Sequence, residues 1–489
     1  MQHKNLLVAL VTTTTHSKHQ VTLVKKQRPF WLAQALAAEQ HCPVTLLQGE
    51  VSADVCIVGG GFTGLWTALQ IKQQSPATSV VVLEADLCGA GASGRNGGCV
   101  LSWATKYMTL QKLFGEAEAK RLVLASEHAI DHIGSFVRKH QIECDFRQDG
   151  VLYTAMAAAH VGSTDSVIAA LEARGLNSYE TLKTEQVASL SGSASNIAGV
   201  FSPRGASVQP GKLVRGMRRV ALEMGVKIYE QSPMIRLDPA ARPVVHGQSG
   251  KVSAKKIVVA LNAWMPAQFS EFSRAIVVVS SDMVVTQARP DLLAQTGLNN
   301  GVAVMDSRTF VYYYHSTSDG RIMLGKGGNT FAFGARMLPV FDQPSPYRVQ
   351  LGEALGKFFP SFAGLNIEAS WNGPSDRATT GLPFFGNLRG HPSIFYGLGY
   401  SGNGVAPSYM GGQILSSLAL EQDNAWTRSG LVKGPRGYFP PEPLRYFGSL
   451  LVRGAIRRKE RAEMLDRKPS RFDVSLSHLA DAAGKADHG

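Results

Sequence analysis

The stretch Val55-Cys56-Ile57-Val58-Gly59-Gly60-Gly61-Phe62-Thr63-Gly64 decides the fold of this chain of 489 residues. Its first four residues form a compact, mainly β-branched run, and a helical pattern begins near Thr63. Gly59, Gly61 and Gly64 therefore satisfy G-x-G-x-x-G between a strand and a helix. The first glycine permits a tight turn, the second lets a pyrophosphate approach the backbone, and the third lets helix and strand pack closely.

A second apolar run, Val80 to Leu83, has the composition of a strand that is buried on both faces of a parallel sheet. It ends at Glu84, about twenty residues after the third glycine, where a carboxylate can accept hydrogen bonds from a ribose hydroxyl. The region therefore predicts a Rossmann-like βαβ unit that binds a dinucleotide, with Phe62 and Thr63 at the helix end that faces the phosphates.

Two further glycine-rich segments favour a flavin over a nicotinamide cofactor. Gly89 to Gly98 follows the ribose carboxylate, and its free backbone amides and Arg95 can bind anionic or carbonyl oxygen. A simple nicotinamide site has no obvious use for such a segment. Gly397 to Gly404 lies between an expected strand at 394–396 and an expected helix at 405–420, whose positive end can stabilise a reduced flavin.

Together these motifs resemble the D-amino-acid-oxidase-like (DAO) family of FAD-dependent amine and amino-acid oxidoreductases, over about residues 50 to 425. Gly-Ala-Ser-Gly-Arg-Asn-Gly-Gly at 91–98 and Gly-Tyr-Ser-Gly-Asn-Gly at 399–404 are most similar to the branch with gamma-glutamylputrescine oxidase and proposed aminophosphonate oxidoreductases. The resemblance implies FAD as the cofactor and places it residue by residue. The ADP half would be held by Gly59, Gly61, Phe62, Thr63, Gly64 and Glu84. The pyrophosphate, ribityl chain and ring would lie near Ser93, Arg95, Asn96, Gly97 and Gly98. The pyrimidine edge would lie over Gly399, Ser401, Gly402, Asn403 and Gly404.

The expected fold class is α/β plus β: a Rossmann-like FAD-binding domain of the glutathione-reductase-like, DAO type with an inserted, mainly antiparallel β-sheet substrate domain. Short β-rich segments between residues 276 and 324, with the turn pair Asp319-Gly320, predict the inserted sheet. The expected strands there are Ile276–Val279, Met283–Thr286, Thr309–His315 and Arg321–Leu324. The expected order is an N-terminal extension (1–49), FAD-binding parts (50–140, 201–275, 366–425), substrate-domain parts (141–200, 276–365) and a basic helical tail (426–489).

Candidate substrate residues come from the segments that the family places over the flavin. They are Trp264, Arg308, Tyr312, Tyr314, His315, Lys326 and Arg377. Strand alternation puts Tyr312 and Tyr314 on one face and Tyr313 and His315 on the other, and we expect the first pair to face the pocket. We interpret His315 as a hydrogen-bonded sheet residue rather than a general base.

Two cations offer alternative roles. Arg377 could bind a substrate carboxylate or phosphonate through two parallel bonds, or could pair with Asp376 or another acid on the surface. Lys326 could lie near the flavin, where it would promote reaction with oxygen or attract an anion. Orientation of the substrate should do most of the catalytic work in this chemistry, because no strong protein base is required.

The function that these features predict is oxidation of a C–N bond in a small amine or amino acid. A hydride would pass from the carbon next to nitrogen to flavin N5, and the resulting imine would hydrolyse, with O2 or another electron acceptor closing the cycle. Three alternatives remain open. An aminophosphonate oxidoreductase is the nearest. A tRNA-modifying flavoprotein would suit the net charge of +13, but no recognisable RNA-binding module accompanies the motifs, so no nucleic acid is expected. A quinone-linked dehydrogenase on a membrane surface would use the tail.

The tail carries an amphipathic pattern that could make peripheral membrane contact. Leu444, Phe447, Leu451 and Ala455 share one helical face, with Arg453, Arg457 and Arg461 broadly opposite.

The five cysteines show neither metal-ligand spacing nor a disulfide framework, so we expect no metal and a cytoplasmic location. The apolar run Leu6 to Val11 is too short for a signal peptide, and Thr12 to Lys26 is interpreted as a disordered leader or an over-extended start.

We predict that FAD is bound without a covalent link. No histidine lies between His41 and His128, and Cys144 is the last cysteine, so both residue types are missing where relatives attach their flavin. The purified protein should be yellow, and acid precipitation should release intact FAD. Cys99 is the remaining nucleophile near the glycine-rich segment, and flavin that stays with the precipitate would contradict the prediction.

Overall fold

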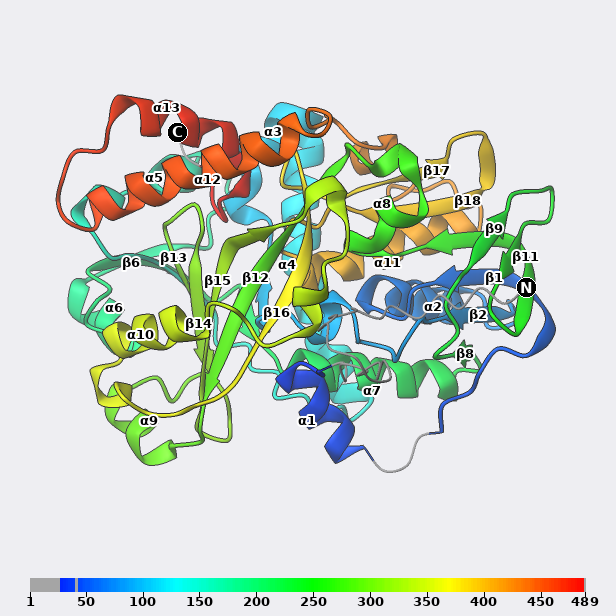
Figure 1. Cartoon of the computed structure of the whole chain (residues 1–489), viewed down its shortest axis with the longest axis horizontal. Helices are drawn as coiled ribbons and strands as arrows, with labels where there is room; N and C mark the ends of the chain where they lie inside the picture. The colour runs from blue at the N-terminus through cyan, green and yellow to red at the C-terminus, as the bar shows by residue number, and fades with distance from the viewer. Residues whose placement is uncertain (1–26, 40–42, 488–489) are drawn as a thin grey trace, which may run out of the picture.

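The computed structural model describes residues 27–39 and 43–487, and these contain two eight-stranded sheets and a two-stranded ribbon (Figure 1). The first sheet has β1 at its centre, parallel to β2 on one side and to β11 on the other. Its strands are β1 (Gly49–Val58), β2 (Val80–Leu83), β8 (Lys227–Tyr229), β9 (Arg236–Asp238), β10 (Val244–His246), β11 (Gly250–Val259), β17 (Phe384–Leu388) and β18 (His391–Leu398). All four residues of β2 are buried. The predicted βαβ unit is confirmed.

The helices of this part cover the sheet and pack on one another. Helix α2 (Phe62–Gln74) follows β1 directly and contacts both α7 (Pro210–Glu223) and α11 (Val405–Ala419). Helix α4 (Glu116–Lys139) contacts α11 in turn. Side chains of α2 such as Leu65 and Leu69 are fully buried, so the helix that the sequence predicted near Thr63 is covered almost all round.

The second sheet is mainly antiparallel, with the order β16-β12-β15-β14-β13-β4-β6-β5. Its strands are β4 (Val151–Ala155), β5 (Glu180–Leu182), β6 (Ala198–Ser202), β12 (Ile276–Thr286), β13 (Ala303–Asp306), β14 (Tyr312–Ser316), β15 (Ile322–Phe331) and β16 (Ile367–Ala378). The ribbon is β3 (Cys99–Leu101) with β7 (Gly205–Ser207). The other helices are α1 (Phe30–Ala38), α3 (Tyr107–Phe114), α5 (Asp165–Glu172), α6 (Thr184–Ser191), α8 (Met265–Gln268), α9 (Pro290–Thr296), α10 (Arg348–Phe358), α12 (Leu444–Glu463) and α13 (Arg471–Ser477).

Two sequence expectations about this sheet need correction. The segments expected as separate strands at 276–279 and 283–286 are one strand, β12. The strand continues because the polar residues in its middle hydrogen-bond to each other: Ser280 Oγ donates to Asp282 Oδ2 at 2.6 Å. Strand β16 pairs with β12 as far as Ala378. The predicted boundary at residue 366 therefore has to move to the end of β16.

The segment expected to be an N-terminal extension contributes to the core. Trp31 and Leu32 of α1 have no exposed surface, and the Trp31 ring stacks on His315 and meets Trp371 edge-on. Gln209 at the start of α7 donates to the Trp31 carbonyl oxygen at 2.9 Å. Residues 30–38 thus belong to the folded body, whereas the predicted leader at 12–26 lies outside the described residues.

The tail is helical as predicted, and α12 lies across the end of the second sheet (Figure 1). Leu444, Phe447 and Leu451 are exposed, but Ala455 is buried, and Arg453 and Arg457 donate to oxygens of Asn329 on β15. Two of the three arginines thus contact the protein instead of forming an open basic face. Within the described part of the chain, no helix combines the length and apolarity that crossing a bilayer requires. Membrane contact through the tail stays a prediction.

Replacing Trp31 with Ala should lower the free energy of unfolding by about 3–5 kcal/mol, because a fully buried indole leaves a cavity between α1, α7 and β16. Chemical denaturation followed by fluorescence measures the change. Tyr438, which is 58% exposed, offers the comparison: Tyr438→Ala should cost far less. If Trp31→Ala lowered the free energy of unfolding as little as Tyr438→Ala, α1 would contribute little to stability.

Candidate functional site

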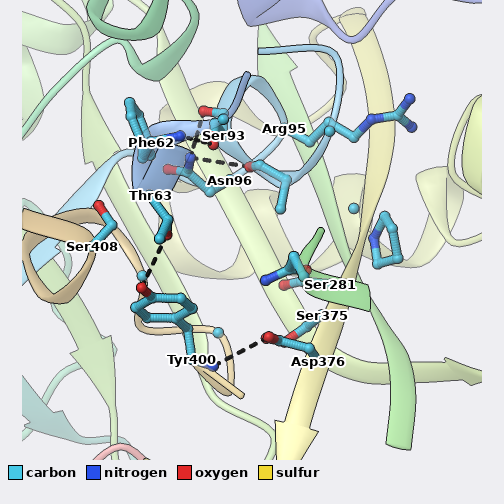
Figure 2. Close-up of a pocket in the computed structure, with 18 of the residues that line it drawn as sticks. Phe62, Thr63, Ser93, Arg95, Asn96, Ser281, Ser375, Asp376, Tyr400 and Ser408 are labelled. Atoms are coloured by element: carbon cyan, nitrogen blue, oxygen red, sulfur yellow. Dashed lines mark hydrogen bonds between the residues drawn. The ribbon is translucent and has the colours of Figure 1, made fainter. Parts of the chain in front are cut away.

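A large cavity lies at the carboxyl ends of β1, β2 and β11, with the second sheet forming its far wall. Ligands bind at this edge of parallel sheets because loops and helix N-termini meet there. Figure 2 shows labelled side chains that line the cavity, drawn from the first sheet's loops and from β12 and β16. The described site residues that line it from the predicted set are Gly59, Gly61, Phe62, Thr63, Glu84, Ser93, Arg95, Asn96, Gly97, Trp264, Arg377, Gly402 and Gly404.

The glycine turn presents bare backbone to the cavity. Gly59 has φ +112°, and a side chain there would clash with the Ala260 carbonyl. Gly61 is the N-cap of α2 and offers no side-chain cap, while a Cβ on it would lie 2.9 Å from Ser93 Oγ. The backbone amide of Phe62 donates to Ser93 Oγ at 2.8 Å (Figure 2). This arrangement fits a pyrophosphate against the positive end of α2. Gly64 does not line the cavity; it lets α2 pack against Gly59.

Glu84 reaches the cavity from the end of β2, as the sequence predicted. Its carboxylate accepts backbone N–H bonds from Gly60 at 2.8 Å and Asp86 at 3.0 Å. Burial nevertheless raises the pKa of Glu84 to about 7. A ligand hydroxyl that donates to this carboxylate would favour its charged form, which suits a ribose.

The second glycine-rich segment supplies one cavity wall, but Arg95 has another task. Its Nε donates to the Ala90 carbonyl at 2.8 Å, its Nη2 pairs with Asp342 at 2.6 Å, and Nη1 donates to the Phe341 carbonyl. In Figure 2 the guanidinium points away from Ser93 and Asn96. The expected charge-assisted bond from Arg95 to the cofactor is therefore corrected: the guanidinium ties this segment to the loop at 339–342. Asn96 Oδ1 accepts from the Gly98 amide at 2.9 Å and fixes the turn.

Cys99 follows this segment and also lines the cavity. Burial raises the pKa of its thiol to about 12. The thiolate is the nucleophilic form, so this environment disfavours a covalent bond from Cys99. The non-covalent link stays a prediction, supported by this observation.

The third glycine-rich segment is held by Asp376 of β16. The Asp376 carboxylate accepts from the amides of Gly399 and Tyr400, and burial raises its pKa to about 6. Ser401 Oγ accepts from the Ala378 amide at 3.0 Å. Gly399, Ser401 and Asn403 thus shape the loop, while Gly402 and Gly404 line the cavity.

The tyrosines expected in the pocket face the other way. Tyr314 is buried with its hydroxyl bonded to Asn196, at 2.8 Å, and Tyr312 lies between Arg308 and Lys326. Tyr313 lines the cavity instead, with its hydroxyl 2.6 Å from Ser281 Oγ. The alternation was predicted correctly and the face was wrong, because Tyr312 and Tyr314 pack on the α10 side against Phe358.

Lys326 shares the face of Tyr312 and therefore also lies away from the cavity. Its Nζ donates to the Phe310 carbonyl at 2.7 Å and sits 4.1 Å from the Tyr312 ring centroid. Burial lowers its pKa to about 8. Arg308 pairs with Asp306. The expectation that Lys326 approaches the flavin is thus corrected, since its neighbour Gly327, and not Lys326, lines the cavity from β15.

The two remaining candidates, Trp264 and His315, have different positions. Trp264 lines the cavity. His315 is buried, with Nε2 2.9 Å from the Gly97 carbonyl oxygen and Nδ1 2.7 Å from that of Ser316. Burial lowers its pKa to about 4. This contact pattern is that of a hydrogen-bonded sheet residue.

Arg377 projects into the cavity from β16. Its Nη1 donates to the Ala483 carbonyl at 2.9 Å, while its Nε is buried with no hydrogen-bond partner among the described residues. Asp376 points to the glycine loop from the opposite side of the strand, so the two do not form the surface pair that the sequence left open. Burial lowers the pKa of Arg377. An anion in the cavity would supply the missing partner.

Sequence reasoning missed several cavity residues. Tyr400 lies on the glycine loop and its hydroxyl accepts from Thr63 Oγ1 at 2.9 Å (Figure 2). Met283 and Met305 add apolar wall from β12 and β13. Lys485 enters from the C-terminal tail. The first three lie on segments already expected near the site, whereas nothing local in the sequence marks Lys485.

Comparison with known proteins agrees with this geometry. The family model DAO, described as FAD dependent oxidoreductase, matches residues 54–418. The chain is 28% identical over 386 residues to gamma-glutamylputrescine oxidoreductase of Escherichia coli K12, which covers 78% of this chain and 87% of the relative. It is 27% identical to the probable oxidoreductase OrdL of Haemophilus influenzae, with 78% and 86% covered. The structure of glycine oxidase from Geobacillus kaustophilus superimposes with a TM-score of 0.64 at 18% identity, covering 77% of this chain and 96% of that one.

Replacing Gly61 with Val should abolish FAD binding, because the side chain would fill the space between the α2 N-terminus and Ser93. Flavin content per protein, measured by absorbance after purification, tests this. Gly448→Val on the exposed side of α12, where a Cβ meets nothing within 4 Å, is the matched control and should keep its flavin. If the Gly61→Val variant kept its full content of FAD, the pyrophosphate would not bind beside Gly61.

Proposed function

Since the chain belongs to the DAO family of FAD-dependent oxidoreductases, we propose that it oxidises the C–N bond of a small amine or amino acid that also carries an anionic group. FAD supplies the acceptor for the hydride that leaves the carbon next to nitrogen. The nitrogen loses a proton, and water hydrolyses the imine to a carbonyl compound and the released amine. The two electrons then pass to O2 or another acceptor.

The proposal that the substrate has an anionic group rests on Arg377. A guanidinium whose Nε has no partner and whose Nη1 contacts only a carbonyl retains donors for a bidentate bond. Among the described residues no carboxylate forms an ion pair with it. Binding one end of the substrate through two bonds fixes the distance from the anion to the reacting carbon, which is the orientation that this chemistry requires.

The walls around the reacting end are apolar. Met283, Met305 and Leu101 are almost completely buried and line the cavity. Such walls disfavour an ammonium ion and so favour the neutral amine, which has the lone pair that stabilises charge on carbon as the hydride leaves. Tyr313 and Ser281 contribute the polar groups on this wall.

The names of the relatives agree with this substrate class. Gamma-glutamylputrescine oxidoreductase and glycine oxidase are named for an amine and an amino acid. A phosphonate would satisfy Arg377 as a carboxylate does, so an aminophosphonate substrate falls within the proposal. Anaerobic bleaching of the flavin by a panel of primary amines, N-methyl amines, amino acids and aminophosphonates tests it; a flavin that none of these reduces would contradict it.

Arg377→Lys should lower kcat/KM for the anionic substrate about tenfold to a thousandfold, mainly through KM, because a lysine cannot form two parallel bonds. The informative quantity is the ratio of kcat/KM for the anionic substrate to that for an uncharged amine of similar size. That ratio should fall. An equal loss for both substrates would mean that Arg377 has only a structural task.

A further inference from the structure

Residues 483–487 are fixed against the cavity by specific contacts. The Asp487 amide donates to the Thr105 carbonyl at 2.7 Å, and Thr105 Oγ1 donates to the Lys485 carbonyl at 2.8 Å. The Ala483 carbonyl accepts from Arg377, so the segment also contacts β16. Residues 483–487 lie beyond the part that the family model matches, which ends at 418.

Asp487 anchors this segment at the N-terminus of α3. Its carboxylate accepts from the Thr109 amide at 2.8 Å and from Thr109 Oγ1 at 2.7 Å. A carboxylate in this position caps the helix and interacts favourably with its dipole. The buried Lys106 ammonium lies 3.4 Å from the same carboxylate, so its charge is paired.

The anchored segment brings Lys485 to the cavity beside Arg377. Both cations approach the open side of Gly402: from the point where a Cβ of Gly402 would stand, Arg377 Nη2 and Lys485 Nζ are each 3.6 Å away. Ser375 Oγ is 3.5 Å from the same point and is buried with no hydrogen-bond partner. Three donors from two distant parts of the chain thus converge on one small volume.

One acid, Asp376, lines the same cavity, and its charge partly offsets the lowering of the Arg377 pKa by burial. Lys485 Nζ donates to the Gly402 carbonyl at 2.7 Å, and no ion pair joins it or Arg377 to an acid of the described chain. Asp487 is paired with Lys106, and Asp376 is bonded to the glycine loop. Burial, with the charges of Arg377 and Lys106, lowers the pKa of Lys485 to about 7. Two neighbouring cations in a buried cavity become favourable when an anion lies between them.

We propose that Ser375, Arg377 and Lys485 form an oxyanion subsite that holds the carboxylate or phosphonate of the substrate, and that the C-terminal segment completes the active site by supplying Lys485. The inference rests on the proposed function for the identity of the ligand. It adds that selectivity for anionic substrates depends on a part of the chain beyond the range that the family model matches. A three-donor cluster matches the several oxygens of such a group.

The direct test titrates acetate and methylphosphonate into the holoenzyme and follows the perturbation of the flavin spectrum. Lys485→Met removes the charge at similar length, and Lys485→Arg keeps it. We expect Lys485→Met to weaken binding of both probes about tenfold to a hundredfold and Lys485→Arg to restore most of it. Comparison of the two probes shows whether the subsite prefers a carboxylate or a phosphonate. Lys468→Met, at an exposed tail position, is the control and should bind as the parent does.

A second measurement separates an oxyanion subsite from a structural or cofactor-directed role. Lys485→Met should lower the ratio of kcat/KM for an anionic amine to that for a neutral one. If it instead lowers Tm or FAD affinity and changes both substrates equally, the lysine supports the fold or the flavin and the proposal is overturned. Unchanged probe affinity would also overturn it. Because the probes are not substrates, their titration reports on the subsite even if no amine reduces the flavin.

Discussion

The close approach of bare backbone at Gly59, Gly61 and Gly64 is the constraint on which the rest of the structure depends. A side chain at Gly59 would strike Ala260 after β11, and one at Gly64 would strike Gly59 itself. Without side chains, the end of β1, the start of α2 and the end of β11 meet, and the α2 N-terminus points into a cavity rather than into protein. The cavity therefore results from the close approach of these three backbone segments.

Strand β16 of the second sheet contacts the loops of the first sheet, because its successive side chains point to opposite faces. Asp376 faces one way and holds the amides of Gly399 and Tyr400, which places the third glycine-rich loop. Arg377 and Ser375 face the other way, and all three residues line the cavity. Because neighbouring residues of a strand point to opposite faces, one short segment both fixes the third glycine-rich loop and brings a cation and a hydroxyl to the cavity. This coupling explains why the second sheet extends to Ala378.

Segments from both ends of the described chain complete the body. Helix α1 buries Trp31 against His315 and Trp371, behind the cavity wall, and the C-terminal segment carries Lys485 to the cavity itself. Each is held by contacts with residues far away in sequence, Gln209 for α1 and Thr105 and Thr109 for the tail. Neither segment could fold as observed without the central domain to receive it.

The sequence by itself determined the βαβ unit, the flavin cofactor and the family, because these depend on local rules: strand hydrophobicity, helix capping and the absence of side chains near phosphate. It also determined that Tyr312 and Tyr314 share a face. Only the tertiary structure decided which face turns to the cavity, since that depends on whether α10 or the first sheet covers it. The same holds for Arg95, whose partner Asp342 lies 247 residues away, and for Lys485, which reaches Gly402 across 83 residues. No local pattern encodes such pairs, because packing between distant segments sets them.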